Sequence, residues 1–279
     1  MLSTSDSWAT RREDIKIVNY SLELGHHLLM EALRIMMGHT QNMDKGGALM
    51  RTEIMYRPSY SLAVVTLDPN ERIRVEAGAM VSMSDGMRLE TKASGGILAS
   101  LTRSVLGGES FFMNEYQAPA AGGQVSLAPA LPGDVIALDQ DGERALMVQS
   151  GSYIASSLDV AVDTKWGGAK TFFASEGLFL LRCSGQGKLI LSSYGAIHEM
   201  QLAAGQRHTV DTGHLVAFDE GIGFNVRAIG GIKSTLFSGE GLVVDLTGPG
   251  RVLLQTRSTD AFLTWLMPQV ERRVSRRST

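Results

Sequence analysis

The chain has 279 residues, 44% of them hydrophobic and 20% charged, which suits one large or two ordinary globular domains. A formal net charge of −3 excludes a general electrostatic attraction to nucleic acid or to an anionic membrane. The one cysteine, Cys183, excludes an intrachain disulfide and favours a reducing, cytoplasmic location. Because Cys183 ends the apolar run Leu178–Cys183, we expect a buried core residue rather than a nucleophile.

The first 49 residues differ in character from the rest of the chain. Apolar residues recur near helical spacing from Val18 to Met36 and predict a helix over residues 15–37. We interpret residues 1–49 as a helical extension, or as a segment upstream of a start at Met50; an amphipathic surface or partner helix is the alternative. The sequence shows no signal-peptide core, and no apolar run reaches the ~18 residues of a membrane-spanning helix.

From Met50 onward the pattern is that of short β-strands. Ser61–Leu67 is typical of a buried strand, Asp68–Glu71 of a turn, and Glu71–Val75 of a half-buried strand, because its polar and apolar residues alternate. Gly is frequent, with 31 residues against 7 of Pro, as expected where tight turns join strands. We therefore predict an all-β domain over residues 50–257.

An ordered set of three motifs occurs three times in this domain. The first motif is at Val75–Val81, Val148–Ile154 and Val210–Val216, the second at Phe111–Glu115, Phe172–Glu176 and Leu236–Glu240, and the third at Gly123–Leu127, Gly187–Leu191 and Gly250–Leu254. Such repetition predicts three pseudo-repeated antiparallel β-sandwich units around a pseudo-three-fold axis, at about 50–131, 132–201 and 202–257. The shared glycine of the first motif, at Gly78, Gly151 and Gly213, predicts a β-bulge or a positive φ.

Three segments depart from the repeat. Ile97–Leu106 lies between two Gly pairs in the first unit and predicts a short helix, either packed or acting as a mobile flap. Asp141-Gly142 is a strong hairpin signal and predicts a longer hairpin in the second unit. Residues 258–279 are expected to form a C-terminal helix, shortened or kinked by Pro268, and a solvated basic tail.

Few residues suggest chemistry, because the common nucleophile, phosphate-loop and zinc motifs are absent from the sequence. His198, His208 and His214 would make a cupin-like metal site if antiparallel strands brought them together, and ordinary surface or hydrogen-bonded histidines otherwise. Glu115, Glu176 and Glu240 recur once per unit. They would either share a site, which raises a carboxyl pKa or binds a cation, or accept backbone N–H groups as structural caps. We expect no cofactor and assign no catalytic residue.

Several of these motifs resemble a widespread bacterial and archaeal family related to the fungal "altered inheritance of mitochondria" biogenesis proteins. The resemblance covers about Met50 to Met267. It is carried by Glu76–Met80, Gly108–Phe112, Pro132–Asp134, Gln149–Gly151, Gly187–Gly195, Val210–His214 and Gly248–Arg257. It implies a fold similar to that of the tryptophan RNA-binding attenuation protein, and homo-oligomers, of which a trimer is one plausible form. The family supplies no catalytic residues to transfer.

The leading functional hypothesis is a non-enzymatic binding or scaffold module in the cytoplasm. A membrane-linked form would use Ile97–Leu106 or the N-terminal segment. A small-ligand or metal-dependent enzyme with a site between β units is the first alternative. RNA binding is the second; it rests on fold analogy alone, and the net charge and the 6% aromatic content argue against a nucleic-acid partner.

Overall fold

The computed structural model describes residues 50–90, 105–106, 109–110, 113–163, 179–228 and 242–275. Compactness divides the chain into Met1–Ala48 and Leu49–Thr279, and all described residues lie in the second part. The helix expected over residues 15–37 lies outside the described residues.

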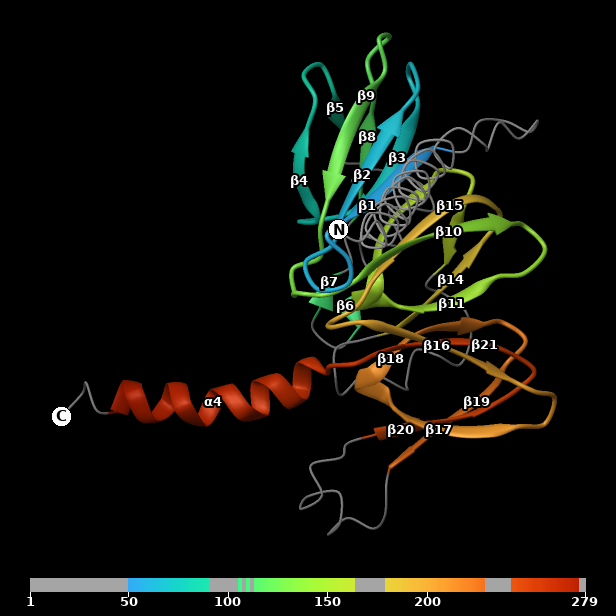
Figure 1. The fold of residues 1–279 in the computed structure, drawn as a ribbon, viewed down its shortest axis with the longest axis vertical. Coiled ribbons are helices and arrows are strands. Elements are labelled where there is room, and N and C mark those ends of the chain that lie inside the picture. The colour runs from blue at the N-terminus through green and yellow to red at the C-terminus, as the bar shows by residue number, and fades with distance from the viewer. Residues whose placement is uncertain are drawn as a thin grey trace, which may run out of the picture. The chain divides into compact units, whose positions relative to one another are not determined.

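Strands dominate the described residues, as the repeat predicts, and nearly all their pairing is antiparallel (Figure 1). The first part of the domain contains β1 (Arg51–Met55), β2 (Leu62–Leu67), β3 (Arg72–Glu76), β4 (Met80–Met83), β5 (Arg88–Glu90), β6 (Val105–Leu106), β7 (Glu109–Ser110), β8 (Met113–Gln117) and β9 (Gly123–Leu127). The middle contains β10 (Val135–Asp141), β11 (Leu146–Gln149), β12 (Tyr153–Ser157), β13 (Ala161–Asp163), β14 (Leu180–Ser184) and β15 (Gln186–Ser192). The last part contains β16 (Ile197–Leu202), β17 (Arg207–Asp211), β18 (Leu215–Asp219), β19 (Gly223–Ala228), β20 (Leu242–Thr247) and β21 (Gly250–Gln255), and helix α4 (Thr259–Ser275) follows.

The described strands form four main sheets. Their orders are β1-β2-β9-β4, β10-β15-β12-β3-β8-β5, β13-β14-β11-β18-β21-β16 and β17-β20-β19. Each part of the domain uses the same pairing scheme. In the middle part, for example, the last strand, β15, lies between β10 and β12, the strand that follows the first-motif glycine. A second group pairs separately, as β11 and β13 do with β14.

A β-bulge occurs in the strand that follows each copy of the first motif. The register against the neighbouring strand shifts between Met80 and Ser82, between Tyr153 and Ala155, and between Leu215 and Ala217. The extra residue is Val81, Ile154 or Val216 in turn. The predicted irregularity therefore lies just after the shared glycine. Of the three glycines, Gly78 has a φ of +94°, whereas Gly151 and Gly213 lie in short 3-10 turns.

Two joints connect the three parts of the domain, and their registers match. At the first joint β12 pairs with β3, and at the second β18 pairs with β11. The opposed residues are Ala155 and Val75, and Ser156 and Arg74, at the first joint; they are Ala217 and Val148, and Phe218 and Met147, at the second. These pairs occupy matching motif positions. Each joint also contributes three apolar side chains to the preceding core: Ile154, Ala155 and Ile190 at the first, and Val216, Ala217 and Leu253 at the second.

The strong turn at Asp141-Gly142 does not make the predicted longer hairpin. Asp141 Oδ1 accepts a hydrogen bond of 2.8 Å from Glu143 N, and Gly142 has a φ of +86°. The strands on either side diverge, however: β10 pairs with β15, whereas β11 pairs with β14 and β18. The turn itself was predicted correctly, but its strand partners were predicted wrongly. A tight turn fixes the local φ values and does not determine which sheet the next strand joins.

Two further expectations about helices need correction. Val105 and Leu106, expected at the end of a short helix, form β6 and pair with β7; the rest of that segment lies outside the described residues. Helix α4 continues through Pro268 to Ser275, so Pro268 does not shorten it. Near the proline, Gln269 Nε2 donates to Trp265 O at 3.1 Å and Arg272 Nε donates to Pro268 O at 3.0 Å.

Helix α4 is fixed at its N-terminal end and has no buried residue. Ser258 O accepts from Phe262 N at 3.1 Å, and the Phe262 ring meets the Tyr194 ring edge-on at a centroid distance of 6.1 Å. Among the described helices, none is both long and apolar enough to cross a bilayer.

Candidate functional site

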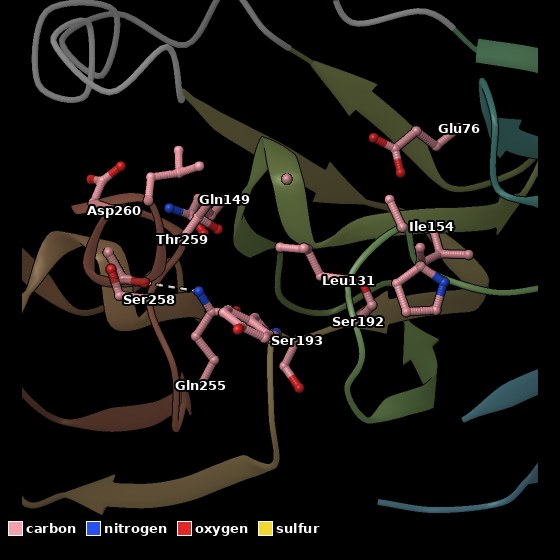
Figure 2. Close-up of a pocket in the computed structure, with 16 residues that line it drawn as sticks. Glu76, Leu131, Gln149, Ile154, Ser192, Ser193, Gln255, Ser258, Thr259 and Asp260 are labelled. Carbon is pink, nitrogen blue, oxygen red and sulfur yellow. Dashed lines mark hydrogen bonds between the residues drawn. The ribbon is translucent and has the colours of Figure 1, made fainter. Parts of the chain in front are cut away.

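A cavity of about 420 Å³ lies where residues from all three parts of the domain meet. Glu76 comes from the end of β3, Gln149 from the end of β11 and Gln255 from the end of β21. The start of α4 supplies Thr259 and Asp260. Figure 2 shows Glu76 and Asp260 on opposite sides of the view. The apolar lining includes Leu131, Ile154 and Leu263. The cavity thus has polar groups at two sides and an apolar wall between them.

Gln255 holds the floor of the cavity in place. Its Oε1 accepts from Tyr194 N and its Nε2 donates to Gly213 O, both at 2.8 Å. A Cβ on Gly213 would lie 2.7 Å from Ser258 Oγ, so this turn needs glycine for close approach rather than for a special φ. Because both ends of the Gln255 amide are satisfied, we assign this residue a structural role.

Gln149 is a lining residue with an unsatisfied hydrogen-bond donor. Its side chain is buried, with 3% exposure, and its Nε2 has no hydrogen-bond partner in the structure. A buried donor of this kind is costly unless a partner is supplied. None of the described lining residues is Lys, Arg or His, while Glu76 and Asp260 add carboxylates. The cavity therefore suits an uncharged molecule that offers a hydroxyl or carbonyl acceptor, and it disfavours an anion.

A half-buried ion pair links residues before β2 to the residue that precedes β10. Asp134 is buried and receives Arg57 Nε and Nη2 at 2.8 Å each, and Ser61 Oγ at 3.1 Å. Burial by itself raises the pKa of Asp134, but the bonds from Arg57, Ser61 and the Val135 N–H outweigh it and hold that pKa below its usual value. Every hydrogen bond that the Asp134 carboxylate accepts comes from a neighbouring protein group, so we assign this residue a structural role.

The three candidate histidines occupy different surroundings. His198 is exposed on β16, and His208 is exposed on β17, a strand of another sheet. His214 is half-buried, with Nδ1 2.7 Å from Gln255 O. Within the described ranges, no group of three His, Cys, Asp or Glu residues has a metal-binding arrangement.

Of the three recurring glutamates, only Glu115 lies in the described residues. It is buried on β8, and its Oε2 lies 3.5 Å from Arg72 Nη1. Arg72 also donates to Glu90 Oε2 at 2.9 Å. Glu115 therefore belongs to a small ion-pair cluster within the first part of the domain. Glu176 and Glu240 lie outside the described residues. Cys183 is buried, as predicted, and burial raises its pKa to about 12, which excludes a thiolate at neutral pH.

Two strand edges form a second candidate site. Among the described strands, β4 pairs only with β9, and β17 only with β20. Their counterparts β12, β18, β3 and β11 are paired on both sides. Val81 in β4 is 57% exposed, whereas Ile154 and Val216, at the matching bulges, are 1% and 0% exposed. Val81 is thus an exposed apolar side chain at the position that is buried at both internal joints.

Sequence reasoning located the motif positions but missed both the cavity and the free edges. The cavity residues Glu76 and Gln149 occupy the same place in the first motif, where the third copy has Asp211. A polar residue at that place in all three copies was a usable signal. The free edges had no comparable signal, because only pairing shows which copy of a repeat lacks a neighbour.

Comparison with known proteins identifies relatives along most of the domain. A protein of Streptococcus pyogenes serotype M6 is 27% identical over 221 residues, which are 76% of this chain and 88% of that protein. A crystal structure of another S. pyogenes protein, SPYM3_0169, aligns with a TM-score of 0.66 at 25% identity and covers 79% of this chain and 99% of its own. The expected likeness to the tryptophan RNA-binding attenuation protein stays a prediction.

The family model described as mitochondrial biogenesis AIM24 matches residues 52–257, within two residues of the β domain expected from the sequence. This match includes the cavity residues Glu76 and Gln149 and both free edges, and α4 follows it. The chain belongs to the mitochondrial biogenesis AIM24 family.

Proposed function

We propose that the protein is a non-enzymatic scaffold whose copies join head to tail, edge strand β4 of one copy pairing with edge strand β17 of the next. The carrying observation is Val81, exposed at the bulge position where Ile154 and Val216 are buried by a neighbouring strand. In this proposal residues 50–131, 132–201 and 202–257 are three repeats of one β unit. The contact between copies is then a third use of the joint already present twice within the chain.

The recurring registers support a specific geometry for this contact. If the register of the internal joints is applied to the two free edges, Ser82 lies opposite Val210 of the second copy, and Met83 lies opposite its Thr209. The added strand would satisfy the unpaired backbone groups of both edges, as in other cases of strand addition. Because the two edges differ, the contact is heterologous and leads to a ring or a filament.

The side chains at the free edge favour a reversible contact over a permanent one. At the positions of Ala155 and Ala217 the first unit has Ser82, and at those of Ile190 and Leu253 it has Ser126. Val81 and Met83 remain exposed and apolar. Serines on an edge strand limit indiscriminate pairing, while the two apolar side chains still supply burial when the correct partner docks.

Cysteine cross-linking tests both the contact and its register. Directly opposed residues have Cβ atoms about 4.5–5.5 Å apart, close enough for a disulfide after small adjustments. The double variant Met83→Cys/Thr209→Cys should form a ladder of covalent multimers on mild oxidation, while buried Cys183 stays unreactive. Each single variant should form none, because the two positions meet only between different edges.

The control pair is Met83→Cys with His208→Cys, which shifts the register by one residue and turns the thiols to opposite faces. It should give no ladder. Dimers from Met83→Cys alone would replace the head-to-tail contact with a symmetric one. A wild-type mass of one chain in analytical ultracentrifugation at 100 µM (roughly the range expected for weak specific contacts) would overturn the proposal.

A second function is favoured by the unpartnered Gln149 donor: binding of a small uncharged ligand in the cavity. The test is a thermal-shift panel of hydroxyl- and amide-bearing molecules beside matched carboxylate-bearing ones. A stabilising molecule from the uncharged set that loses its effect on Gln149→Met supports the site. Equal shifts in wild type and variant place the ligand elsewhere, and a panel without shifts removes this function.

A further inference from the structure

We propose that α4 is an interfacial anchor that lies on an anionic phospholipid surface, an inference independent of head-to-tail assembly. The helix spans Thr259–Ser275, and none of its residues is buried. Its large apolar side chains Leu263, Trp265, Met267, Val270 and Val274 are 43%, 63%, 46%, 41% and 59% exposed. Exposed apolar side chains concentrated on one helix mark an interaction surface.

The apolar residues share one side of α4. At 3.6 residues per turn, six apolar residues fall within roughly 140° of arc: Phe262, Leu263, Leu266, Met267, Val270 and Val274. The same arc also contains Arg273 in the last turn. Thr264, Glu271 and Ser275 lie opposite. Trp265 borders the apolar side next to Phe262, with the two ring centroids 6.1 Å apart. A broad apolar side bordered by an indole is typical of helices that lie in the headgroup region.

The charges of α4 favour a bilayer over a parallel pair of these helices. The last turn contains Arg272 and Arg273, and the sequence continues with Arg276 and Arg277. Two such helices side by side in parallel would bring these arginines together, which is unfavourable, whereas lipid phosphates attract them. Arginine stems also let a guanidinium reach phosphate while the helix lies flat. The chain's net charge of −3 means that the attraction is local to this end.

The attachment of α4 leaves this surface accessible. Phe262 is held against Tyr194, and the Ser258 carbonyl accepts the Phe262 N–H, so the first turn is fixed. From Leu263 onward only Leu266 and Gln269 are half-buried, and the other described residues are exposed. The anchor is therefore preformed, and binding costs little ordering of the backbone.

Vesicle co-sedimentation of the full chain tests the anchor. Wild type should bind vesicles of phosphatidylcholine with phosphatidylglycerol, and bind pure phosphatidylcholine vesicles more weakly. Val270→Asp/Val274→Asp should lower the partition coefficient at least about tenfold, and Arg272→Glu/Arg273→Glu about tenfold on anionic vesicles only. Leu89→Asp, which changes an exposed apolar residue on β5, should bind like wild type.

Two further readouts keep the result interpretable. Brominated lipid should quench a fluorescence component that Trp265→Phe removes, which places α4 itself at the interface. Unchanged unfolding midpoints of the variants separate lost binding from lost folding. Wild type that stays in the supernatant with anionic vesicles, or Val270→Asp/Val274→Asp that binds like wild type, overturns the anchor. A drop in oligomer mass in Val270→Asp/Val274→Asp without any change in vesicle binding assigns the surface to a second copy instead.

Discussion

Ile154 and Val81 lie at matching β-bulges, and their surroundings differ because only Ile154 is in a strand that is paired on both sides. Ile154 is 1% exposed and packs into the core of the first part of the domain, while Val81 is 57% exposed on an edge. The bulge directs both side chains in the same way. The difference teaches that burial at this position is supplied by the strand across the joint. In the proposed repeat, the first unit would therefore leave one copy of the joint uncovered.

The largest effect should come from truncating the buried member of this pair. Ile154→Ala removes three carbons from a packed core and should lower the free energy of unfolding by about 2–5 kcal/mol. Val81→Ala in dilute solution should change it by no more than about 0.5 kcal/mol, since the side chain is exposed. Urea denaturation of both variants measures the contrast. Equal losses would mean that Val81 is already covered in the single chain.

A smaller effect is expected at the ion pair between Arg57 and Asp134. Asp134→Asn weakens its bonds with Arg57 and should cost about 2–3 kcal/mol, below the ~3–5 kcal/mol of a fully buried pair because the Arg57 side chain is 51% exposed. The lowered pKa of Asp134 means that its contribution is present above the unfolded-state pKa of about 4 and is lost as pH falls through the folded-state value.

The difference in stability between wild type and Asp134→Asn should therefore shrink as pH is lowered below about 4. Denaturation series across this range measure it. Asp245→Asn, at the exposed pair with Arg227, is the matched control and should cost much less. A difference in the free energy of unfolding between wild type and Asp134→Asn that stays constant down to pH 2 would contradict a stabilising role for the ion pair.

The smallest effect, and one of opposite sign, is expected at Gln149. Gln149→Met keeps the size of the side chain and removes the buried donor that has no partner, so stability should stay the same or rise by up to about 1 kcal/mol. The midpoint of thermal unfolding measures the change. Gln255→Met, which breaks two bonds, is the contrast and should destabilise. A clear loss of stability in Gln149→Met would show that its amide is satisfied in solution.

The sequence predicted much of the fold because its signals are local. The alternation in Arg72–Glu76, the turn at Asp68–Glu71 and the helix after Ser258 all depend on neighbours within a few residues. Strand partners were less predictable, as Asp141-Gly142 shows, since pairing depends on distant residues. The candidate site was hardest. The histidines attracted attention by type, while Gln149 became notable only once burial and the absence of a partner were known.

The identical registers of the two internal joints have a consequence for stoichiometry. In the proposed repeat of three β units, the step from one unit to the next uses the same register at both joints. The geometry of that step would then be present within one chain. A closed assembly made with that step must contain a whole number of chains and hence a number of units divisible by three. In the proposed assembly, covalent linkage would restrict the ring sizes that unlinked units could form. It would also let each unit diverge to suit its own position in the assembly.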